Sequence, residues 1–313
     1  MDSDFSKIYS KLKHKGIVPY ILSLRRHKAQ GFMSNVYALD SSEGKLIVHL
    51  NKIHDEQRRQ QVWEKIAVVG NILEKFSEIP TATILLSGTI EQKYFIVQKM
   101  LNGKVAGERI LKKNLFIDIW RIWSNNLGKD IEKTIACIHQ IPVKGYGWII
   151  NQDGTLKGSY ESWDKFLESE VNTWSKTIKQ FENSTILVEK LLKHFKINKL
   201  KFAIKKSFLV HGDITNPGNI LIHDKKVVGF LDWEWSLAGD PAWEFALNNR
   251  YSLNTYFNSF KDKLNQKEEK SFLERARLYE PLLLMWALHM HSKDRTPEIY
   301  QAARNHLIKL GFA

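Results

Sequence analysis

The sequence predicts an α+β protein of two lobes, a smaller β-rich lobe followed by a larger, mainly helical one. In the first hundred residues, short apolar runs with strand character are separated by polar turns. From residue 105 onward, apolar side chains recur mostly at helical spacing. Strands first and helices later are typical of the α+β class. We therefore expect a first lobe at residues 1–97, a connection at 98–103 and a second lobe at 104–313.

The elements of the first lobe follow from local patterns. Residues 1–15 are expected to form a helix, and residues 56–76 carry apolar side chains at helical spacing. Between residues 24 and 52 the pattern indicates two strands around a polar turn. Two further strands are expected at 84–86 and 94–97, so the lobe combines a sheet with helices.

The second lobe is expected to be helical, interrupted by one hairpin within residues 220–231. The strongly apolar stretch 279–289 predicts a buried helix. Asp240 and Pro241 predict the start of another helix, because Asp is favoured at the N-cap and Pro in the first turn. Asp240 is therefore interpreted as a scaffold residue.

Composition limits the classes of function. The chain has 313 residues, 43% of them hydrophobic, and no apolar run long enough to span a membrane. The net charge is +13, but the basic residues are spread along the chain, which argues against nucleic-acid binding as the main function. Cys137 is the single cysteine and excludes an internal disulfide. With no evident signal peptide, we expect a cytoplasmic protein, as a monomer or weak dimer.

The most informative segment is 211–222, which begins His-Gly-Asp and contains Asn219. Asp232 follows after the expected hairpin, in Asp-Trp-Glu. Phosphoryl transfer from ATP needs a carboxylate that accepts the hydroxyl proton of the acceptor, and oxygen ligands for Mg²⁺. Asp213 suits the first role, and Asn219 and Asp232 suit the second. The alternative is a surface turn followed by an ordinary hairpin, which requires none of these flanking residues.

Neighbouring residues are expected to support this site. His211 is interpreted as a donor whose hydrogen bond fixes the loop, and Gly212 as the residue that permits a tight approach. Glu234, expected on the same side of a strand as Asp232, would support the metal site, with an ordinary surface Glu as the alternative. Asn216 is the rival metal ligand, although its position before Pro-Gly indicates turn chemistry.

These motifs closely resemble those of the aminoglycoside phosphotransferase family, which belongs to the protein-kinase-like small-molecule kinases. Residues 138–147 and 239–246 are similar to further family motifs, so the resemblance runs from about residue 30 to 250. It implies a two-lobed protein-kinase-like fold that uses ATP (or GTP) and Mg²⁺ to phosphorylate a small-molecule hydroxyl. The family usually places the Asn five residues after the Asp, and here it is six. We expect a loop bulge at Gly218 to absorb the extra residue.

The nucleotide is expected to lie in a cleft between the lobes. Gly31, Ser34 and Asn35 lie where such a kinase folds its phosphate-covering loop, and they offer small side chains and exposed backbone N–H groups. A plain turn between strands is the alternative. Gln98 and Met100, at the crossover between the lobes, are expected to lie against the nucleotide.

A kinase also needs a cation for the ATP phosphates. By resemblance, His49 occupies that position, although imidazole is only partly charged at neutral pH. Lys52 is the alternative cation, and a strand His without such a role is equally compatible with the pattern. Glu64 is the candidate helix partner of the cation, with Glu56 as the runner-up.

The motifs do not identify the acceptor, which is the small molecule that receives the phosphoryl group. A polycationic aminoglycoside would require clustered carboxylates. Seven glutamates are candidates, but each neighbours Lys or Arg, so pairing on helix surfaces is the default interpretation. They are Glu161, Glu168, Glu170, Glu268, Glu269, Glu274 and Glu280. The aromatic end of the stretch 279–289 could instead border a pocket for a less polar substrate. Trp233, Trp235 and Trp243 are expected to be core residues rather than ligand platforms.

We therefore expect an ATP-dependent kinase of a small molecule, with an antibiotic such as an aminoglycoside as the leading acceptor. A metabolic kinase for a choline-, homoserine- or sugar-like substrate would share every catalytic residue. A non-catalytic nucleotide-binding protein is the alternative from another class, supported by the altered spacing and by His49.

Overall fold

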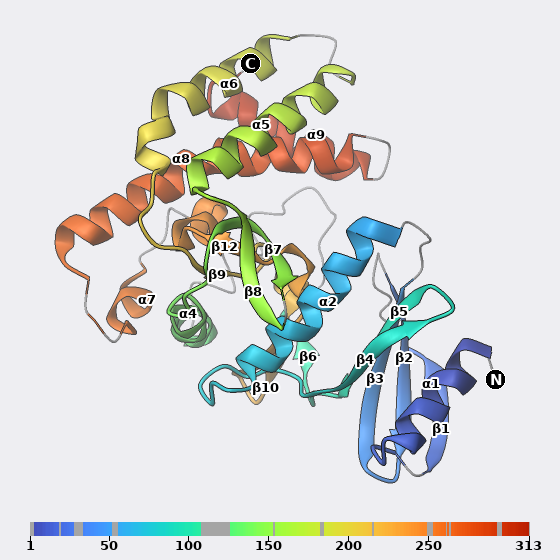
Figure 1. Cartoon of the computed structure of the whole chain (residues 1–313). Helices are drawn as coiled ribbons and strands as arrows, with labels where there is room; N and C mark the ends of the chain where they lie inside the picture. Colours follow the sequence, from blue (N-terminus) through green and yellow to red (C-terminus); the bar gives the residue numbers. More distant parts are fainter. Residues whose placement is uncertain are drawn as a thin grey trace. The chain divides into compact units, whose positions relative to one another are not determined.

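A computed structural model describes most of the chain. The described residues are 3–18, 20–27, 34–51, 56–107, 126–152, 154–181, 185–214, 216–248, 253–260, 262, 264–292 and 296–312. The chain divides into two compact units, residues 1–103 with 150–156, and residues 104–149 with 157–313 (Figure 1). Among the described residues, no helix combines the length and apolar character needed to cross a membrane.

The first unit is organised around an antiparallel sheet. Its described strands lie in the order β1-β2-β3-β5-β4. Their bounds are β1 Ile21–Arg26, β2 Ser34–Ser41, β3 Gly44–Asn51, β4 Ile84–Ile90 and β5 Lys93–Lys99. The pairing places His49 of β3 opposite Val36 on one side and Ile96 on the other. The four expected strands are confirmed as β2, β3, β4 and β5, whereas β1, which begins at Ile21, was not predicted as a separate strand.

Two helices accompany this sheet, α1 (Ser3–His14) and α2 (Glu56–Leu73), and both were expected. Phe5, Ile8 and Leu12 of α1 belong to the same buried cluster as the apolar residues of the sheet. A Cβ added to Gly70 of α2 would lie 2.4 Å from the Ile84 side chain, so Gly permits close packing of α2 on β4.

Helices dominate the second unit. Their bounds are α4 Asn126–Ile138, α5 Trp163–Lys179, α6 Ile186–Asn198, α7 Asn254–Asn258, α8 Gln266–His291 and α9 Pro297–Lys309. Helices α5, α6 and α9 all contact α8 (Figure 1). The expected buried helix over 279–289 is confirmed as the second half of α8, where Tyr279, Leu282 and Met285 are fully buried.

The second unit contains more strand than the sequence analysis expected. The described strands form a sheet in the order β8-β7-β12-β9, of which residues 150–156 of β7 and β8 are grouped with the first unit, and a smaller sheet in the order β11-β10-β6. Their bounds are β6 Lys104–Val105, β7 Tyr146–Gln152, β8 Thr155–Tyr160, β9 Phe208–Val210, β10 Ile220–His223, β11 Lys226–Phe230 and β12 Leu237–Gly239. The expectation of a single hairpin was therefore wrong. β9 and β12 have three residues each, too few to show an alternating pattern.

The predicted hairpin is confirmed as β10 and β11. Asp224 and Lys225 form its turn with φ values of 47° and 63°, and positive φ at both central residues is typical of a type I′ turn. The Leu231 N–H donates to the Asn219 carbonyl at 2.7 Å. The hairpin therefore returns the chain so that Leu231, directly before Asp232, lies beside Asn219.

Short 3₁₀ helices occupy the segments around the motifs. They are η1 Lys199–Phe202, η2 Pro217–Asn219, η3 Trp233–Trp235 and η4 Pro241–Asn248. Two expectations were wrong here: Glu234 lies in η3 rather than in a strand, and η2 replaces the expected bulge at Gly218. Asp240 accepts a hydrogen bond from the Ala242 N–H at 3.1 Å, which confirms that it caps the helix beginning at Pro241.

Candidate active site

The His211-Gly212-Asp213 segment directly follows strand β9. Gly212 has a φ of +87°, and a Cβ added there would lie 2.2 Å from the Trp235 carbonyl oxygen. The position thus requires Gly for both its backbone conformation and its lack of a side chain. As expected from the sequence, Gly212 brings the loop close to the segment that follows Asp232.

His211 is buried beneath this loop. Its Nε2 lies 2.8 Å from the Leu231 carbonyl oxygen, and the Asp213 N–H donates to its Nδ1 at 3.3 Å. A neutral imidazole with its proton on Nε2 satisfies both contacts. Burial lowers the pKa of His211, which favours that neutral form. The side chain therefore ties Asp213 to the end of the hairpin, in line with the supporting role expected for it.

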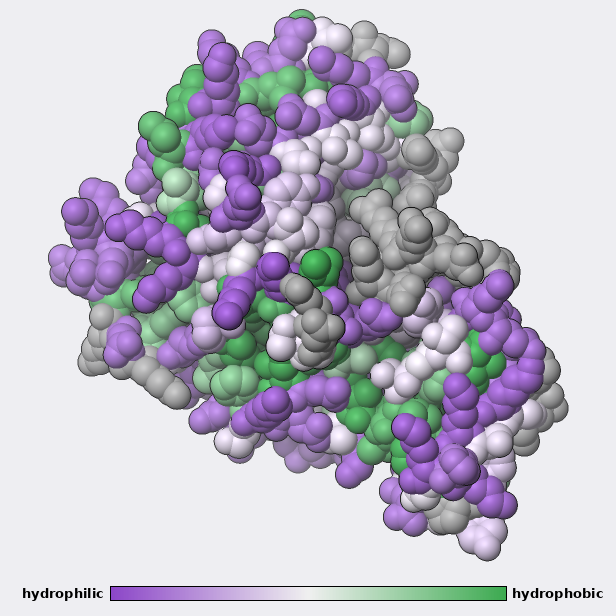
Figure 2. Space-filling view, in the orientation of Figure 1, coloured by the Kyte–Doolittle hydropathy of each residue, from purple (hydrophilic) through white to green (hydrophobic). Residues whose placement is uncertain are grey.

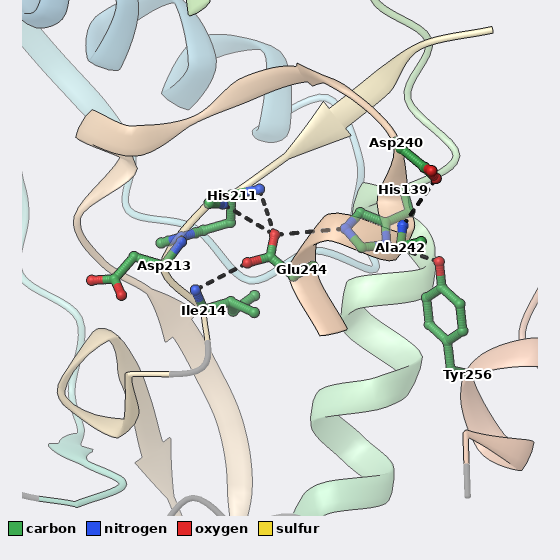
Figure 3. Close-up of polar contacts among 9 residues, drawn as sticks. His139, His211, Asp213, Ile214, Asp240, Ala242, Glu244 and Tyr256 are labelled. Atoms are coloured by element: carbon green, nitrogen blue, oxygen red, sulfur yellow. Dashed lines mark hydrogen bonds and ion pairs between the residues drawn. The ribbon is translucent and has the colours of Figure 1, made fainter. Parts of the chain in front are cut away.

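Glu244 of η4 binds the backbone of the same loop (Figure 3). Its Oε2 accepts from the N–H groups of His211 at 2.8 Å and Gly212 at 3.1 Å, and its Oε1 accepts from Ile214 at 3.1 Å. Burial alone would raise the pKa of Glu244, but His139, His211 and the loop N–H groups lower it overall. Glu244 is thus an ionised carboxylate, 3% exposed, that holds the loop containing Asp213.

A second group of buried residues lies behind Glu244. His139, which follows α4, places Nε2 3.8 Å from the Glu244 Oε2 and Nδ1 2.9 Å from the Tyr256 hydroxyl oxygen. Glu132 of α4 accepts from the Tyr256 backbone N–H at 2.9 Å. The sequence analysis quoted His139 and Glu244 within motifs but gave them no role. A His and a Glu inside segments rich in apolar residues were the available signal.

Asp213 is oriented by two asparagines. The Nδ2 of Asn219 donates to the Asp213 backbone oxygen and to its Oδ2, both at 2.9 Å. The Nδ2 of Asn216 lies 3.3 Å from the same Oδ2, while its Oδ1 accepts from the Gly218 N–H. The predicted turn chemistry of Asn216 is confirmed. The Asp213 carboxylate points away from Glu244 (Figure 3), so the two acidic groups act on different sides of the loop.

Asp232 adopts an unusual backbone conformation. Its φ of 66° and ψ of 58° lie in the left-handed region, where a residue with a Cβ is uncommon. Its side chain is exposed, and it directly follows Leu231, which bonds to the Asn219 carbonyl. Such conformations concentrate at functional sites. The residue expected to bind metal is therefore both accessible and held in a strained conformation.

These residues fit a Mg²⁺ ion bound together with phosphate oxygens. Because the Asn219 Nδ2 faces Asp213, its Oδ1 is the amide atom suited to a cation, and Asp232 adds a carboxylate. In the part of the chain that the structure describes, no cluster of three or more His, Cys, Asp or Glu forms a metal site by itself. Mg²⁺ commonly takes one or two protein ligands and completes its coordination with substrate phosphates and water.

Asp240 has a scaffold role. Arg275 of α8 donates to both of its carboxylate oxygens, and the Tyr279 hydroxyl donates to Oδ2 at 2.9 Å. Trp163 Nε1 in turn donates to the Tyr279 oxygen at 2.8 Å. These contacts attach the start of η4, and with it Glu244, to α8 and α5.

The residues expected to contact the nucleotide belong to the first unit. Burial, with a smaller contribution from the charge of His27, lowers the pKa of His49 to about 4. His49 is therefore neutral at physiological pH in this structure, and its Nε2 lies 3.4 Å from the Gln98 Nε2. The Met100 N–H is already bonded to the Lys45 carbonyl at 2.9 Å. If a permanently charged side chain contacts the ATP phosphates, it must belong to a residue other than His49.

The other nucleotide-side residues lie on β2 and α2. Ser34 is buried, Asn35 accepts from Arg26 at 3.3 Å, and Glu64 is partly exposed. Lys65, which the sequence analysis did not single out, is only 3% exposed. Gly31, Lys52 and the side chain of Glu56 lie outside the described residues.

The sequence model of the phosphotransferase enzyme family matches residues 29–248. The chain belongs to this family. This phosphotransferase also has the family's protein-kinase-like fold, so the predicted fold class is confirmed. No curated protein sequence matches it.

Solved structures resemble the phosphotransferase over nearly its whole length. A thermostable mutant of aminoglycoside phosphotransferase APH(4)-Ia, in ternary complex with AMP-PNP and hygromycin B, is 14% identical, with a TM-score of 0.69 and 97% of each chain covered. A putative fructosamine-3-kinase from Haemophilus somnus 129PT is 15% identical, with a TM-score of 0.61, and the alignment covers 98% of this chain and 97% of that one. At these identities the likeness establishes the fold.

The two asparagines of the phosphotransferase are expected to respond differently to substitution. Asn219→Ala should raise the Mg²⁺ concentration needed for half-maximal activity about tenfold or more, because it removes the amide oxygen that we expect to bind the cation. Asn216→Ala should mainly lower stability, by about 1 kcal/mol, because it removes a turn-capping side chain. Titration of Mg²⁺ at fixed ATP, with thermal melts of both variants, measures these effects. The opposite pattern would place the metal on Asn216.

His49 should make the stability of the phosphotransferase dependent on pH. The unfolded residue gains a proton as pH falls below 6.5, whereas the folded residue does so only near 4. Its contribution is thus fully present above pH 6.5 and is lost between 6.5 and 4, by roughly 3 kcal/mol at most. Chemical denaturation of the parent and His49→Gln across this range should show a flatter profile for the variant. Parallel profiles would contradict the lowered pKa of His49, which is partly buried in the structure.

Proposed function

We propose that the protein transfers the terminal phosphoryl group of ATP (or GTP) to a hydroxyl of a small molecule, with Mg²⁺. The observation that supports this most strongly is the position of Asp213. Its Oδ2 lies within 2.9 Å of the Asn219 amide, on a loop whose backbone is bound to the buried Glu244. The complexes of structural neighbours with AMP-PNP and GDP support a nucleoside triphosphate as the donor.

The proposed chemistry assigns one task to each group. Asp213 accepts the proton of the acceptor hydroxyl, whose oxygen forms a bond to the terminal phosphorus as the bond to the leaving nucleoside diphosphate breaks. Asn219 and Asp232 would hold Mg²⁺, which neutralises phosphate charge when bound. His211 and Glu244 keep the loop fixed, so little reorganisation accompanies the transfer.

The first unit is proposed to bind the nucleotide. Ser34 and Asn35 would contribute to the phosphate-covering loop, and His49 and Glu64 would lie on the phosphate side. Gln98 and Met100 are proposed to lie beside the nucleotide base. Because His49 is neutral, its contribution would be a hydrogen bond rather than a permanent charge.

A screen for acceptor-dependent ATP consumption by the purified chain tests this function. The panel should contain aminoglycosides, macrolides, peptide antibiotics and common metabolites, with and without Mg²⁺. Turnover with an antibiotic would support a resistance role, and turnover with a sugar-like metabolite would favour a metabolic kinase, as the name of the fructosamine-3-kinase neighbour suggests. Mg²⁺-dependent nucleotide binding without turnover on any acceptor would contradict the enzymatic proposal. The cytoplasmic location stays a prediction.

A further inference from the structure

Three partly exposed tryptophans lie together in the second unit. They are Trp148 of β7, Trp235 of η3 and Trp286 of α8. The ring centroids of Trp148 and Trp235 are 6.0 Å apart, and those of Trp235 and Trp286 are 5.1 Å apart. The rings are inclined by 58° and 78°, so they form the walls of an aromatic corner rather than a stack.

This aromatic corner adjoins the catalytic loop. The backbone of Trp235 packs so closely on Gly212 that a Cβ there would lie 2.2 Å from the Trp235 carbonyl oxygen. The three rings and Gly212 line a cavity of about 10 Å³, whose other lining residues are all apolar. Because the cavity holds no more than about one water molecule, an acceptor would meet the exposed ring surfaces at its rim.

Four of the seven glutamates considered for binding a polycation already have partners. Lys165 lies 2.6 Å from Glu161, Lys199 lies 2.7 Å from Glu168, and Lys201 lies 2.6 Å from Glu274. Glu268 completes the capping box of α8. Figure 2 shows both hydrophilic and hydrophobic areas on the drawn face, and the whole chain carries a net charge of +13. The charge balance therefore disfavours recruitment of a molecule with several ammonium groups.

We propose that the aromatic corner, Trp148, Trp235 and Trp286, binds the acceptor, and that this acceptor is an alcohol with a flat apolar face and at most one positive charge. This inference rests on the proposed phosphotransferase function, because it names the substrate class of the same site. Tryptophan faces bury large apolar area and bind flat rings or a single cation. The sequence analysis placed Trp235 in the core. Its partial exposure beside the loop favours the opposite role.

Binding without nucleotide tests the corner independently of turnover. We would titrate the full chain with 2-naphthaleneethanol, propranolol (a naphthyl alcohol with one ammonium group) and kanamycin, by calorimetry. The first two should bind, and kanamycin should bind about tenfold more weakly or not at all. Trp286→Leu and Trp148→Leu should each weaken binding of the naphthyl probes about tenfold, whereas Phe181→Leu, an exposed aromatic outside the cavity lining, should not. Two tryptophan variants are used because either one could misfold. A thermal melt of each variant would reveal such misfolding.

Tighter binding of kanamycin than of both naphthyl probes would overturn the proposal, as would absence of binding by both naphthyl probes. Equal weakening by Phe181→Leu would also overturn it. Once an acceptor that the enzyme phosphorylates is known, steady-state kinetics give a further test. Trp286→Leu should raise the KM for that acceptor and leave the KM for ATP unchanged. Failure of the phosphotransferase function itself would appear separately, as absence of Mg²⁺·ATP binding in a titration without any acceptor.

Discussion

Asp213→Asn is expected to abolish nearly all phosphoryl transfer while leaving the fold intact. The substitution keeps the size of the side chain and its place beside the Asn219 amide, but it removes the carboxylate proposed to accept the hydroxyl proton. The rate should fall by about 10²- to 10⁴-fold, which is the usual contribution of a positioned general base. ATP affinity should change little, because the proposed nucleotide and metal ligands lie elsewhere. Steady-state kinetics and nucleotide titration measure both effects.

Asp224→Asn is the matched control for this change. Asp224 lies in the turn of the β10–β11 hairpin with a φ of 47°, a conformation that Asn also tolerates, and its side chain is 88% exposed. The chemical change is the same, yet activity should match that of the parent. If Asp213→Asn kept more than about a tenth of the parental rate, a general-base contribution of the usual size would be excluded.

The arrangement of residues 211–232 was predictable because its signal is local. His211, Asp213 and Asn219 lie within one motif, and the hairpin that leads to Asp232 has an evident pattern of apolar strands around a polar turn. The backbone bond from Leu231 to Asn219 follows from that hairpin. Spacing along the chain therefore carried most of the information about which residues meet.

The supports of the loop were not predictable in the same way. Glu244 lies 33 residues after His211, and Tyr256 lies 117 residues after His139. No periodicity relates such positions, since their contacts depend on how η4, α4 and α7 pack. The strands β9 and β12 were missed for a similar reason, because each has three residues and pairs with a distant segment.

Glu244→Gln is expected to cause a large loss of both stability and activity. The parent carboxylate accepts from three backbone N–H groups, whereas the amide would turn a donor toward some of them. Leaving buried donors unsatisfied should cost roughly 3 kcal/mol. The loss of loop order should also lower kcat about tenfold or more, with less change in the KM for ATP. Denaturant melts and steady-state kinetics of the variant provide the test.

Glu280→Gln separates loop positioning from a general loss of stability. Glu280 is also buried, at 7% exposure, and it pairs with His306 at 2.8 Å between α8 and α9. Substitution of Glu280 should lower stability but not kcat.

The stabilising contribution of Glu244 should depend on pH. Folding lowers the pKa of Glu244, so this contribution is present above the unfolded value of 4.5 and is lost as pH falls below it. The stability difference between parent and Glu244→Gln should therefore be constant near neutral pH and shrink in acid. A difference that grew on acidification, or an equal loss of kcat in both variants, would show that Glu244 does not hold the loop as an ionised carboxylate.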